Sequence, residues 1–235
     1  MIKFVLFKEN ANNIASGSMF DFKPGVNLLV GDQGCGKSTL LSQIEYFREA
    51  NSKKKKFASS GKCKIDLLFE GEAKKFGYFD FEKHNPRTQP GLDMGYGYDT
   101  NFQVSSMFSS HGETVRALLY PKGTGPFILI LDEPDMALSL RSIHQLVDWL
   151  KKVEKDGTGQ VIMSAHNPYL ISCFDNVLSL EHGKWMKSED FLNTQINDPA
   201  PKFSAKEPRR IEAMRFKPKK KKDKADEVVD ELLKD

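Results

Sequence analysis

A glycine-rich run at residues 31–39 carries the clearest chemistry in this sequence. Residues 31–38 fit the pattern G-x-x-x-x-G-K-[ST] without a deviation, between a short apolar run and a helical pattern. Glycine lets the backbone wrap closely around phosphate groups, so that successive N–H groups and a helix N-terminus face the anion. Lys37 is placed to reach β- and γ-phosphates, and the Ser38 hydroxyl is a ligand for Mg²⁺. The predicted phosphate-binding residues are Gly31, Asp32, Gln33, Gly34, Cys35, Gly36, Lys37, Ser38 and Thr39.

The alternative for this run is an ordinary glycine-rich turn, which the preceding strand and the following helix disfavour. Cys35 lies inside the run, where a helix N-terminus lowers the pKa of a thiol. A redox switch is therefore one interpretation of Cys35, and a small residue that fits the loop is the other. We favour the small-residue interpretation, since free cysteines mostly behave as small hydrophobic groups.

Two adjacent acids at the end of the most apolar run form a second candidate site. Residues 127–131 (FILIL) are followed directly by Asp132 and Glu133. A carboxylate at the tip of a buried parallel strand beside a phosphate loop can hold Mg²⁺, directly or through water, and Asp132 is that candidate. Glu133 can orient or deprotonate an attacking water. The alternative, a pair of solvated turn acids, is weakened by the phosphate loop upstream.

Apolar periodicity predicts the elements that must position these residues. The segments on either side of Gly71-Glu72 are expected to pair as a hairpin, and residues 127–131 are expected to form a central parallel strand. The last strand begins a terminal hairpin that includes Gly183 and Trp185. Strands are predicted at 1–8, 19–23, 26–30, 63–69, 75–81, 127–131, 160–164 and 176–181, and helices at 37–50, 113–120, 138–152 and 168–173.

The composition is that of a globular protein. Of 235 residues, 39% are hydrophobic and 29% are charged, which supplies a core. The apolar runs are too short for a membrane helix or a signal peptide, so we expect no membrane insertion. The three cysteines have no CxxC spacing, which argues against a disulfide framework or a zinc site and favours the reducing cytoplasm.

Charge and composition divide the chain near residue 191. Residues 201–235 hold 12 basic and 8 acidic side chains, a net charge of +4, and the other 200 residues carry 23 basic and 24 acidic side chains, a net charge of −1. We therefore expect an ATP-binding domain at 1–191 and a Pro/Lys-rich flexible tail at 192–235. Within the tail, Val228, Val229, Leu232 and Leu233 would share one face of a short helix.

The motifs together resemble an ABC-type P-loop ATPase head, over roughly residues 1–190. Within that family the sequence is most similar to small stand-alone ATP-binding proteins of bacteria and phages, in the RecF/SMC-like branch. The resemblance rests on five elements in the family order, with an F-x-P-G lead-in at 22–25. They are the phosphate loop (Walker A), Tyr78–Glu82 at the Q-loop position, Ser109–Glu113 as a divergent signature, Leu131–Asp135 (Walker B) with 136–139 as a D-loop, and Ser164–Pro168 as a switch-histidine segment.

This resemblance implies an α/β fold of the P-loop NTPase type with ABC-ATPase-like architecture. Such a fold has a mixed, mainly parallel core sheet flanked by helices, a small antiparallel β subdomain and a small helical lid. The resemblance implies ATP and Mg²⁺ as cofactors, and a head-to-tail, ATP-dependent homodimer in which Ser110 and Gly112 contact the γ-phosphate of the opposite copy. It gives His166 a contact with the γ-phosphate and makes Lys37, Glu133 and His166 catalytic. Glu82, or Asp80, takes the Q-loop position as a metal ligand beside Ser38 and Asp132.

Three functions remain open at this point. The first is an ATPase that hydrolyses ATP and acts on nucleic acid or with an effector protein, for which Lys53–Lys56 and Lys217–Lys224 are candidate contacts; solubilising charge is the alternative for both segments. The second is a nucleotide-sensing module that does not hydrolyse ATP. The third is the ATP-binding subunit of a transporter. The missing Q-loop glutamine, with His111 and Glu113 in the signature, counts against the third.

Overall fold

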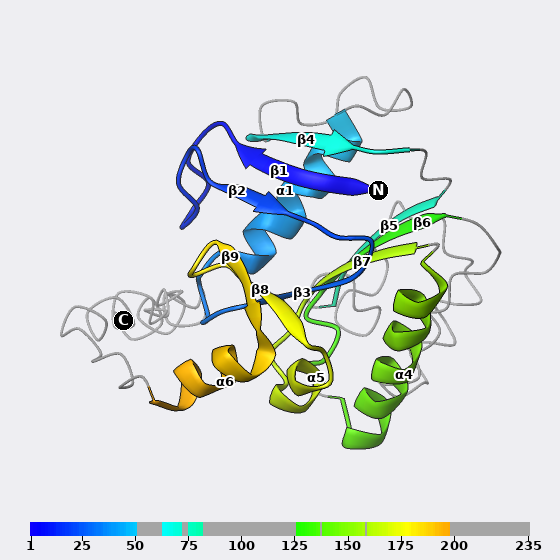
Figure 1. The fold of residues 1–235 in the computed structure, drawn as a ribbon. Helices are drawn as coiled ribbons and strands as arrows, with labels where there is room; N and C mark the ends of the chain where they lie inside the picture. Colours follow the sequence, from blue (N-terminus) through cyan, green and yellow to red (C-terminus); the bar gives the residue numbers. More distant parts are fainter. Residues whose placement is uncertain (51–62, 72–74, 82–125, 137, 158, 198–235) are drawn as a thin grey trace, which may run out of the picture. The chain divides into compact units, whose positions relative to one another are not determined.

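Two β-sheets form the framework of the computed structural model, which describes residues 1–50, 63–71, 75–81, 126–136, 138–157 and 159–197. The smaller sheet has the antiparallel order β2-β1-β4, and the larger has the order β5-β6-β7-β3-β8-β9 (Figure 1). The strands are β1 (Ile2–Phe7), β2 (Met19–Asp21), β3 (Gly25–Val30), β4 (Ile65–Phe69), β5 (Lys75–Asp80), β6 (Phe127–Asp132), β7 (Gly159–Ser164), β8 (Asn176–Ser179) and β9 (Lys184–Lys187).

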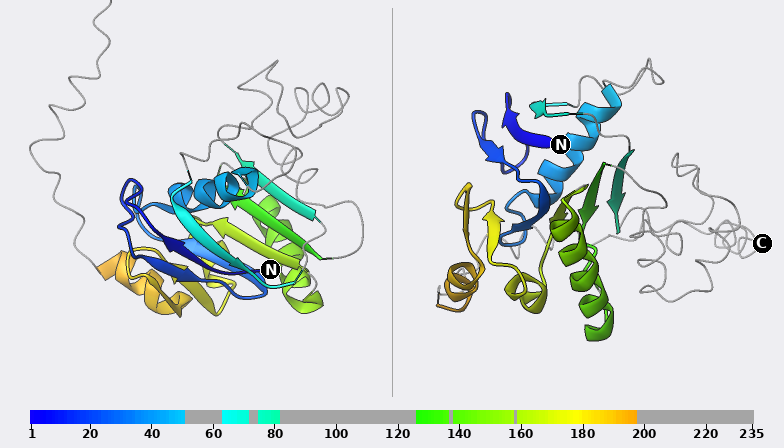
Figure 2. Two further views of the ribbon diagram at one scale, coloured as in Figure 1. Left: turned by 90° about the horizontal axis from the view of Figure 1, so that it is seen from above. Right: turned by 45° about the vertical axis from the view of Figure 1, so that its right-hand side comes forward.

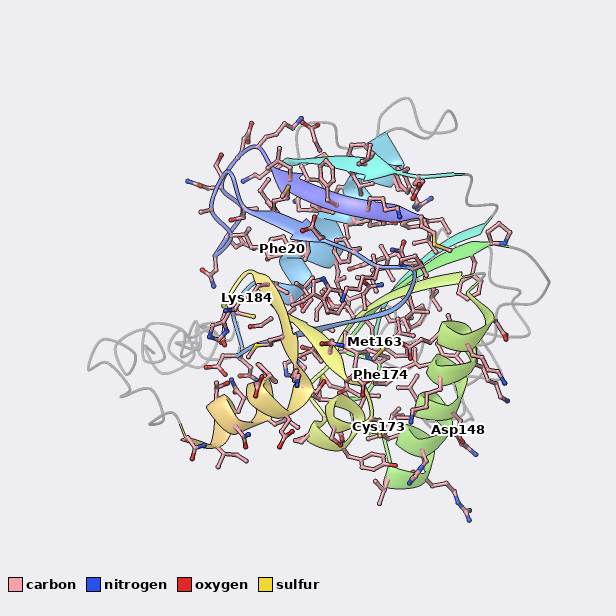
Figure 3. All side chains as sticks on the ribbon, in the orientation of Figure 1. Phe20, Asp148, Met163, Cys173, Phe174 and Lys184 are labelled. Carbon is pink, nitrogen blue, oxygen red and sulfur yellow. The ribbon has the colours of Figure 1, made fainter. Side chains whose placement is uncertain are left out.

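The larger sheet is parallel from β5 to β8, and only β9 runs antiparallel. Both faces of its central strands are covered, which explains their nearly continuous apolar sequence. Val26, Leu28 and Val30 of β3 enter one hydrophobic cluster, whereas Leu29 enters the other. The same alternation of faces holds on the neighbouring strands. The first cluster also contains Val161, Met163, Leu131 and Phe174, and the second also contains Ile162, Ile128, Ile130 and Phe20; Figure 3 labels Met163, Phe174 and Phe20.

Helices cover the two faces of the larger sheet. Helix α1 (Lys37–Ala50) contacts β6 and β7 on one side and β4 of the small sheet on the other. Helix α4 (Leu140–Asp156) packs on the opposite face against β3 and β7, followed by α5 (Pro168–Ser172) and α6 (Ser188–Asn197). Figure 2 shows this layering from two further sides. No helix in these described ranges is long and apolar enough to cross a bilayer.

Helices α4 and α5 have capping residues at their ends. Ser139 accepts a hydrogen bond from the backbone N–H of Ser142 at the start of α4, and Gly157 ends that helix in the left-handed conformation, with φ of 61°. Asn167 caps α5 by accepting from the N–H groups of Tyr169 and Leu170, and Pro168 occupies the first turn.

A buried amide joins the two sheets. The Gln160 side chain is fully buried; its Oε1 accepts from the N–H of Ile2 at 2.8 Å, and its Nε2 donates to the carbonyls of Ile2 (2.8 Å) and Lys23 (2.9 Å). These hydrogen bonds satisfy the backbone N–H and carbonyl of Ile2, at the start of β1, and the carbonyl of Lys23, in the turn before β3. Gln160 therefore fixes the small sheet against the first residues of β7.

The expected α/β architecture with a small antiparallel subdomain is confirmed, but the predicted hairpin around Gly71-Glu72 is wrong. Strand β4 pairs with β1 in the small sheet, whereas β5 lies parallel to β6 in the large one. Period-two alternation indicates a strand without indicating its partner, and the short loop between the two runs suggested local pairing. The helix predicted at 138–152 begins and ends slightly later, as α4, and the terminal hairpin is β8–β9.

Residues Met1–Ile196 form one compact unit, and α6 runs to Asn197. The domain boundary predicted after residue 191 therefore falls inside this helix. Outside the described residues lie positions 198–235 of the predicted flexible tail with its predicted final helix, the segments Lys53–Lys56 and Lys217–Lys224, the helix predicted at 113–120 and the predicted helical lid.

Candidate functional site

The candidate site lies at the carboxyl edge of the large sheet. Strands β3, β7 and β6 are adjacent and parallel, so the segments that follow Val30, Ser164 and Asp132 emerge at the same edge. The phosphate loop follows β3 and leads directly into α1. Strand β7 lies between the strand of the phosphate loop and the strand of the acidic pair, so the end of β7 is at the centre of the site.

Two glycines of the phosphate loop, Gly31 and Gly36, combine a positive φ with a lack of space for a side chain. Gly31 has φ of 143° and Gly36 has φ of 109°, which side-chain-bearing residues rarely adopt. A Cβ on Gly36 would stand 2.8 Å from Cγ1 of Ile14, and a Cβ on Gly31 would stand 2.7 Å from Sγ of Cys35. Burial raises the pKa of the Cys35 thiol, and nearby Lys37 only partly opposes it. A neutral thiol packed on Gly31 supports the interpretation of Cys35 as a small residue that fits.

The Lys37 ammonium is held inside the loop. Only 5% of this residue is exposed, and its Nζ donates to the carbonyls of Gly31 (2.6 Å) and Asp32 (2.9 Å). Carbonyl oxygens are neutral, so the positive charge remains available to an anion. The loop thus presents a fixed cation at the N-terminus of α1, as phosphate binding requires.

Two serine hydroxyls, one on exposed Ser38 and one on buried Ser164, converge on the buried Asp132 carboxyl. Ser38 Oγ donates to Asp132 Oδ1 at 3.2 Å, and Ser164 Oγ donates to the same oxygen at 2.8 Å. Burial raises the pKa of the Asp132 carboxyl, the two serine hydrogen bonds lower it, and the charges of Asp80 and Glu133 raise it. A divalent cation would reverse the effect of burial, because it stabilises the ionised carboxylate.

The donor set fits Mg²⁺. A serine hydroxyl and an aspartate oxygen stand 3.2 Å apart at the mouth of the phosphate loop, and both are the hard oxygen ligands that this ion prefers. In the described ranges, no three His, Cys, Asp or Glu side chains converge on one point.

Glu133 and His166 face each other beside this network. Glu133 has φ of 54°, a strained conformation for a non-glycine residue, and its N–H donates to Ser164 Oγ at 2.7 Å. His166 Nε2 lies 3.3 Å from Glu133 Oε1 and has no hydrogen-bond partner among the described residues. Both side chains are about 30% exposed, although the Nε2 atom of His166 is itself buried.

The remaining predicted residues divide into two groups. Asp80 ends β5 directly opposite Asp132 in the parallel register and is 4% exposed, so the Q-loop position does lie beside the acidic strand. Glu82, Ser110 and Gly112 lie outside the described residues, so their roles stay predictions.

Three sets of contacts at the site are not predicted from the sequence. The sequence places Ser164 at the start of the histidine segment and Asp135 at the end of the acidic motif, but it does not indicate the hydrogen bonds of either side chain. The third is the turn after β1, where Asn12 donates to Thr39 Oγ1 at 3.0 Å and Asn13 donates to the carbonyl of Gly34. The runs NANN (10–13) and SAHN (164–167) are typical of polar residues in turns, but the local sequence does not indicate which residues these side chains contact.

A family model described as an AAA domain (AAA_23) matches residues 9–235. This chain belongs to that AAA domain family. The AAA domain has the fold of an ABC-type P-loop ATPase head: the solved bacterial Atm1-family ABC exporter with ATP bound is 18% identical, with a TM-score of 0.50, over 85% of this chain and 41% of that one.

Curated relatives of the AAA domain include the ribose import ATP-binding protein RbsA of Corynebacterium glutamicum, 25% identical over 74% of this chain and 38% of that protein. UvrABC system protein A of Clostridium perfringens is 34% identical over 40% of this chain and 10% of that protein. This chain therefore spans less than half the length of these relatives.

Proposed function

We propose that this AAA domain binds Mg·ATP and hydrolyses it to ADP and phosphate. The observation that carries the proposal is the network at the loop mouth, in which Ser38 donates a hydrogen bond to Asp132 while the Lys37 ammonium has no anionic partner among the described residues. A carboxylate, a hydroxyl and an ammonium around a glycine loop match the needs of a metal-bound triphosphate. The relatives that are ribose and galactose/methyl galactoside import ATP-binding proteins support the same ligand.

Each residue then has a definite task. The loop N–H groups and Lys37 bind and orient the phosphate oxygens, and Ser38 and Asp132 would hold Mg²⁺, which neutralises the charge of the phosphates. Glu133 orients the attacking water and accepts its proton. His166, 3.3 Å from the Glu133 carboxylate, contacts the γ-phosphate and limits where that water can stand.

The dimer belongs to the same proposal. Two copies would pack head to tail, so that Ser110 and Gly112 of one copy close the site of the other. The exposed side chains of Met136 (50%) and Leu140 (63%) lie on the segment after the acidic pair and at the start of α4, and they provide apolar area for such an interface. We also assign the domain to the RecF/SMC-like branch, on the lead-in at 22–25, and propose nucleic acid or an effector protein as its partner.

Replacement of the proposed base tests this function. Glu133→Gln should lower phosphate release by about 10²–10⁴-fold while nucleotide binding is retained. Glu154→Gln, an exposed glutamate on α4, is the matched control and should leave turnover unchanged. Equal turnover of Glu133→Gln and wild type would refute Glu133 as the base. Molar mass in ATP, measured for the slow variant, tests the dimer, and an invariant monomer would exclude it.

Phosphate release with and without DNA, on the full chain and on a truncation after residue 200, tests the nucleic-acid partner. A rate that DNA does not change in either form would contradict that partner. ATP binding without any phosphate release would favour the nucleotide-sensing module instead.

A transporter subunit is the second candidate, because several relatives are import ATP-binding proteins. Co-purification with a membrane protein would support it, whereas turnover of the isolated chain that no membrane fraction changes would argue against it.

A further inference from the structure

Asp135 joins the two loops that carry the proposed catalytic pair. It stands three residues after the end of β6, and its Oδ2 accepts hydrogen bonds from the backbone N–H groups of His166 (2.8 Å) and Asn167 (2.7 Å), just after β7. The residue is 6% exposed. One carboxylate oxygen therefore fixes two successive peptide groups.

These two bonds restrict the orientation of His166. When consecutive N–H groups point at one charged acceptor, the peptide planes on both sides of the His166 Cα are fixed, and so is the direction in which its side chain leaves the backbone. A second hydrogen bond between these segments, from the Glu133 N–H to Ser164 Oγ at 2.7 Å, fixes the backbone of Glu133. The distance of 3.3 Å between Glu133 Oε1 and His166 Nε2 depends on both sets of hydrogen bonds.

The arrangement is not what stability alone would favour. The second oxygen of Asp135, Oδ1, is buried and has no hydrogen-bond partner among the described residues. Burial of a carboxylate with one oxygen unsatisfied is unfavourable. Capping of α5 does not need Asp135 either, since the Asn167 side chain already accepts from the N–H groups of Tyr169 and Leu170. Stability therefore does not explain this buried carboxylate, and its role is better sought in the segment that it holds, His166 and Asn167.

We propose that Asp135 is a positioning residue for the reaction, which holds the backbone of His166 so that the imidazole faces Glu133 and the phosphate loop. The proposal rests on the proposed hydrolytic function, and it makes Asp135 act through His166 and not on the nucleotide itself. Loss of Asp135 should therefore matter only while His166 is present.

A double-mutant cycle on the full chain tests this dependence. Asp135→Ala should lower kcat for Mg·ATP by about 10- to 100-fold, as expected when a catalytic group is displaced by about 1 Å, with KM changed less than about threefold. In the His166→Ala background, the same substitution should lower kcat by less than about twofold. Asp135→Asn, which keeps one oxygen acceptor for the two N–H groups, should restore most of the loss.

Hydrogen exchange at the His166 and Asn167 amides gives a readout that does not need turnover. Asp135→Ala should speed exchange there by at least about tenfold, because both N–H groups lose their acceptor. Gln160→Met, which removes buried hydrogen bonds at the opposite end of β7, is the control for general destabilisation and should change neither these amides selectively nor kcat.

Equal losses of kcat for Asp135→Ala with and without His166 would overturn the proposal, as would failure of Asp135→Asn to exceed Asp135→Ala. If the wild-type chain releases no phosphate, the proposed function fails, and the exchange measurement alone decides whether Asp135 holds the segment. Unchanged amide exchange in Asp135→Ala would then refute it.

Discussion

Ser164 provides the sharpest test of how the site is organised. Its side chain is fully buried at the end of β7, where Oγ donates to Asp132 Oδ1 at 2.8 Å and accepts from the Glu133 N–H at 2.7 Å. One hydroxyl thus fixes the proposed metal ligand and the strained backbone of the proposed base. Ser164→Ala removes both bonds and leaves nearly the same volume.

The expected loss of stability follows from these two bonds. A hydrogen bond to a carboxylate contributes about 1.5–3 kcal/mol, and one between neutral groups contributes about 0.5–1.5 kcal/mol. Asp132 can take up a proton and so reduce the first loss, because burial already raises its pKa. We therefore expect Ser164→Ala to lower the free energy of unfolding by about 2–3 kcal/mol, measured by urea denaturation without nucleotide.

Catalysis should be affected in a specific way. Because Asp132 and Glu133 lose their common anchor, Ser164→Ala should raise the Mg²⁺ concentration needed for half-maximal turnover and lower kcat by at least about tenfold. Ser179→Ala is the matched control: Ser179 is also fully buried at the end of a strand, but its hydroxyl bonds to His182. If the two variants gave the same Mg²⁺ dependence, the assigned role of Ser164 would be wrong.

Three further substitutions test other parts of the site. Asp132→Asn should stabilise the nucleotide-free protein at pH 7, because burial raises the pKa of this carboxyl in the folded state. The wild-type folded state therefore loses stability as the pH rises from the unfolded pKa, about 3.9, through the folded pKa. The urea midpoints of the variant and the wild type should converge near pH 4. Gly36→Ala, at φ of 109° with Ile14 in the way, should weaken Mg·ATP binding by calorimetry at least about tenfold, whereas Gly157→Ala, at φ of 61° in open space, should not. Gln160→Met should lower the free energy of unfolding by about 2–4 kcal/mol in urea, since three buried hydrogen bonds are lost.

The strand and helix that flank two segments of the candidate site are encoded by local sequence. The phosphate loop is defined by its own glycines and by the flanking strand and helix, so both its position and its context could be predicted from about 25 consecutive residues. Asp132 and Glu133 were located in the same way, because they end the most apolar strand. Their proximity to the loop follows from parallel strands that end at one edge of the sheet.

The parts that depend on long-range pairing could not be predicted. Strand β4 alternates much as a hairpin partner would, but its neighbour is β1, and β5 belongs to the other sheet. The buried acceptor role of Asp135 likewise depends on how the chain after β6 lies against the chain after β7, which are about 30 residues apart in the sequence. Side-chain partners at that separation are fixed by strand order, which periodicity does not contain.

Strand order also explains why the end of β7 carries so many site contacts. Because β7 lies between β3 and β6, the bridge from Ser38 to Asp132 must pass over its carboxyl end. A large side chain at Ser164 would stand in that path, and an apolar one would leave the Glu133 N–H without an acceptor. A small hydroxyl residue meets both demands, and His166 follows it two residues later at the same edge of the sheet. The interposed strand thus acts as the support on which the phosphate loop and the acidic pair are held together.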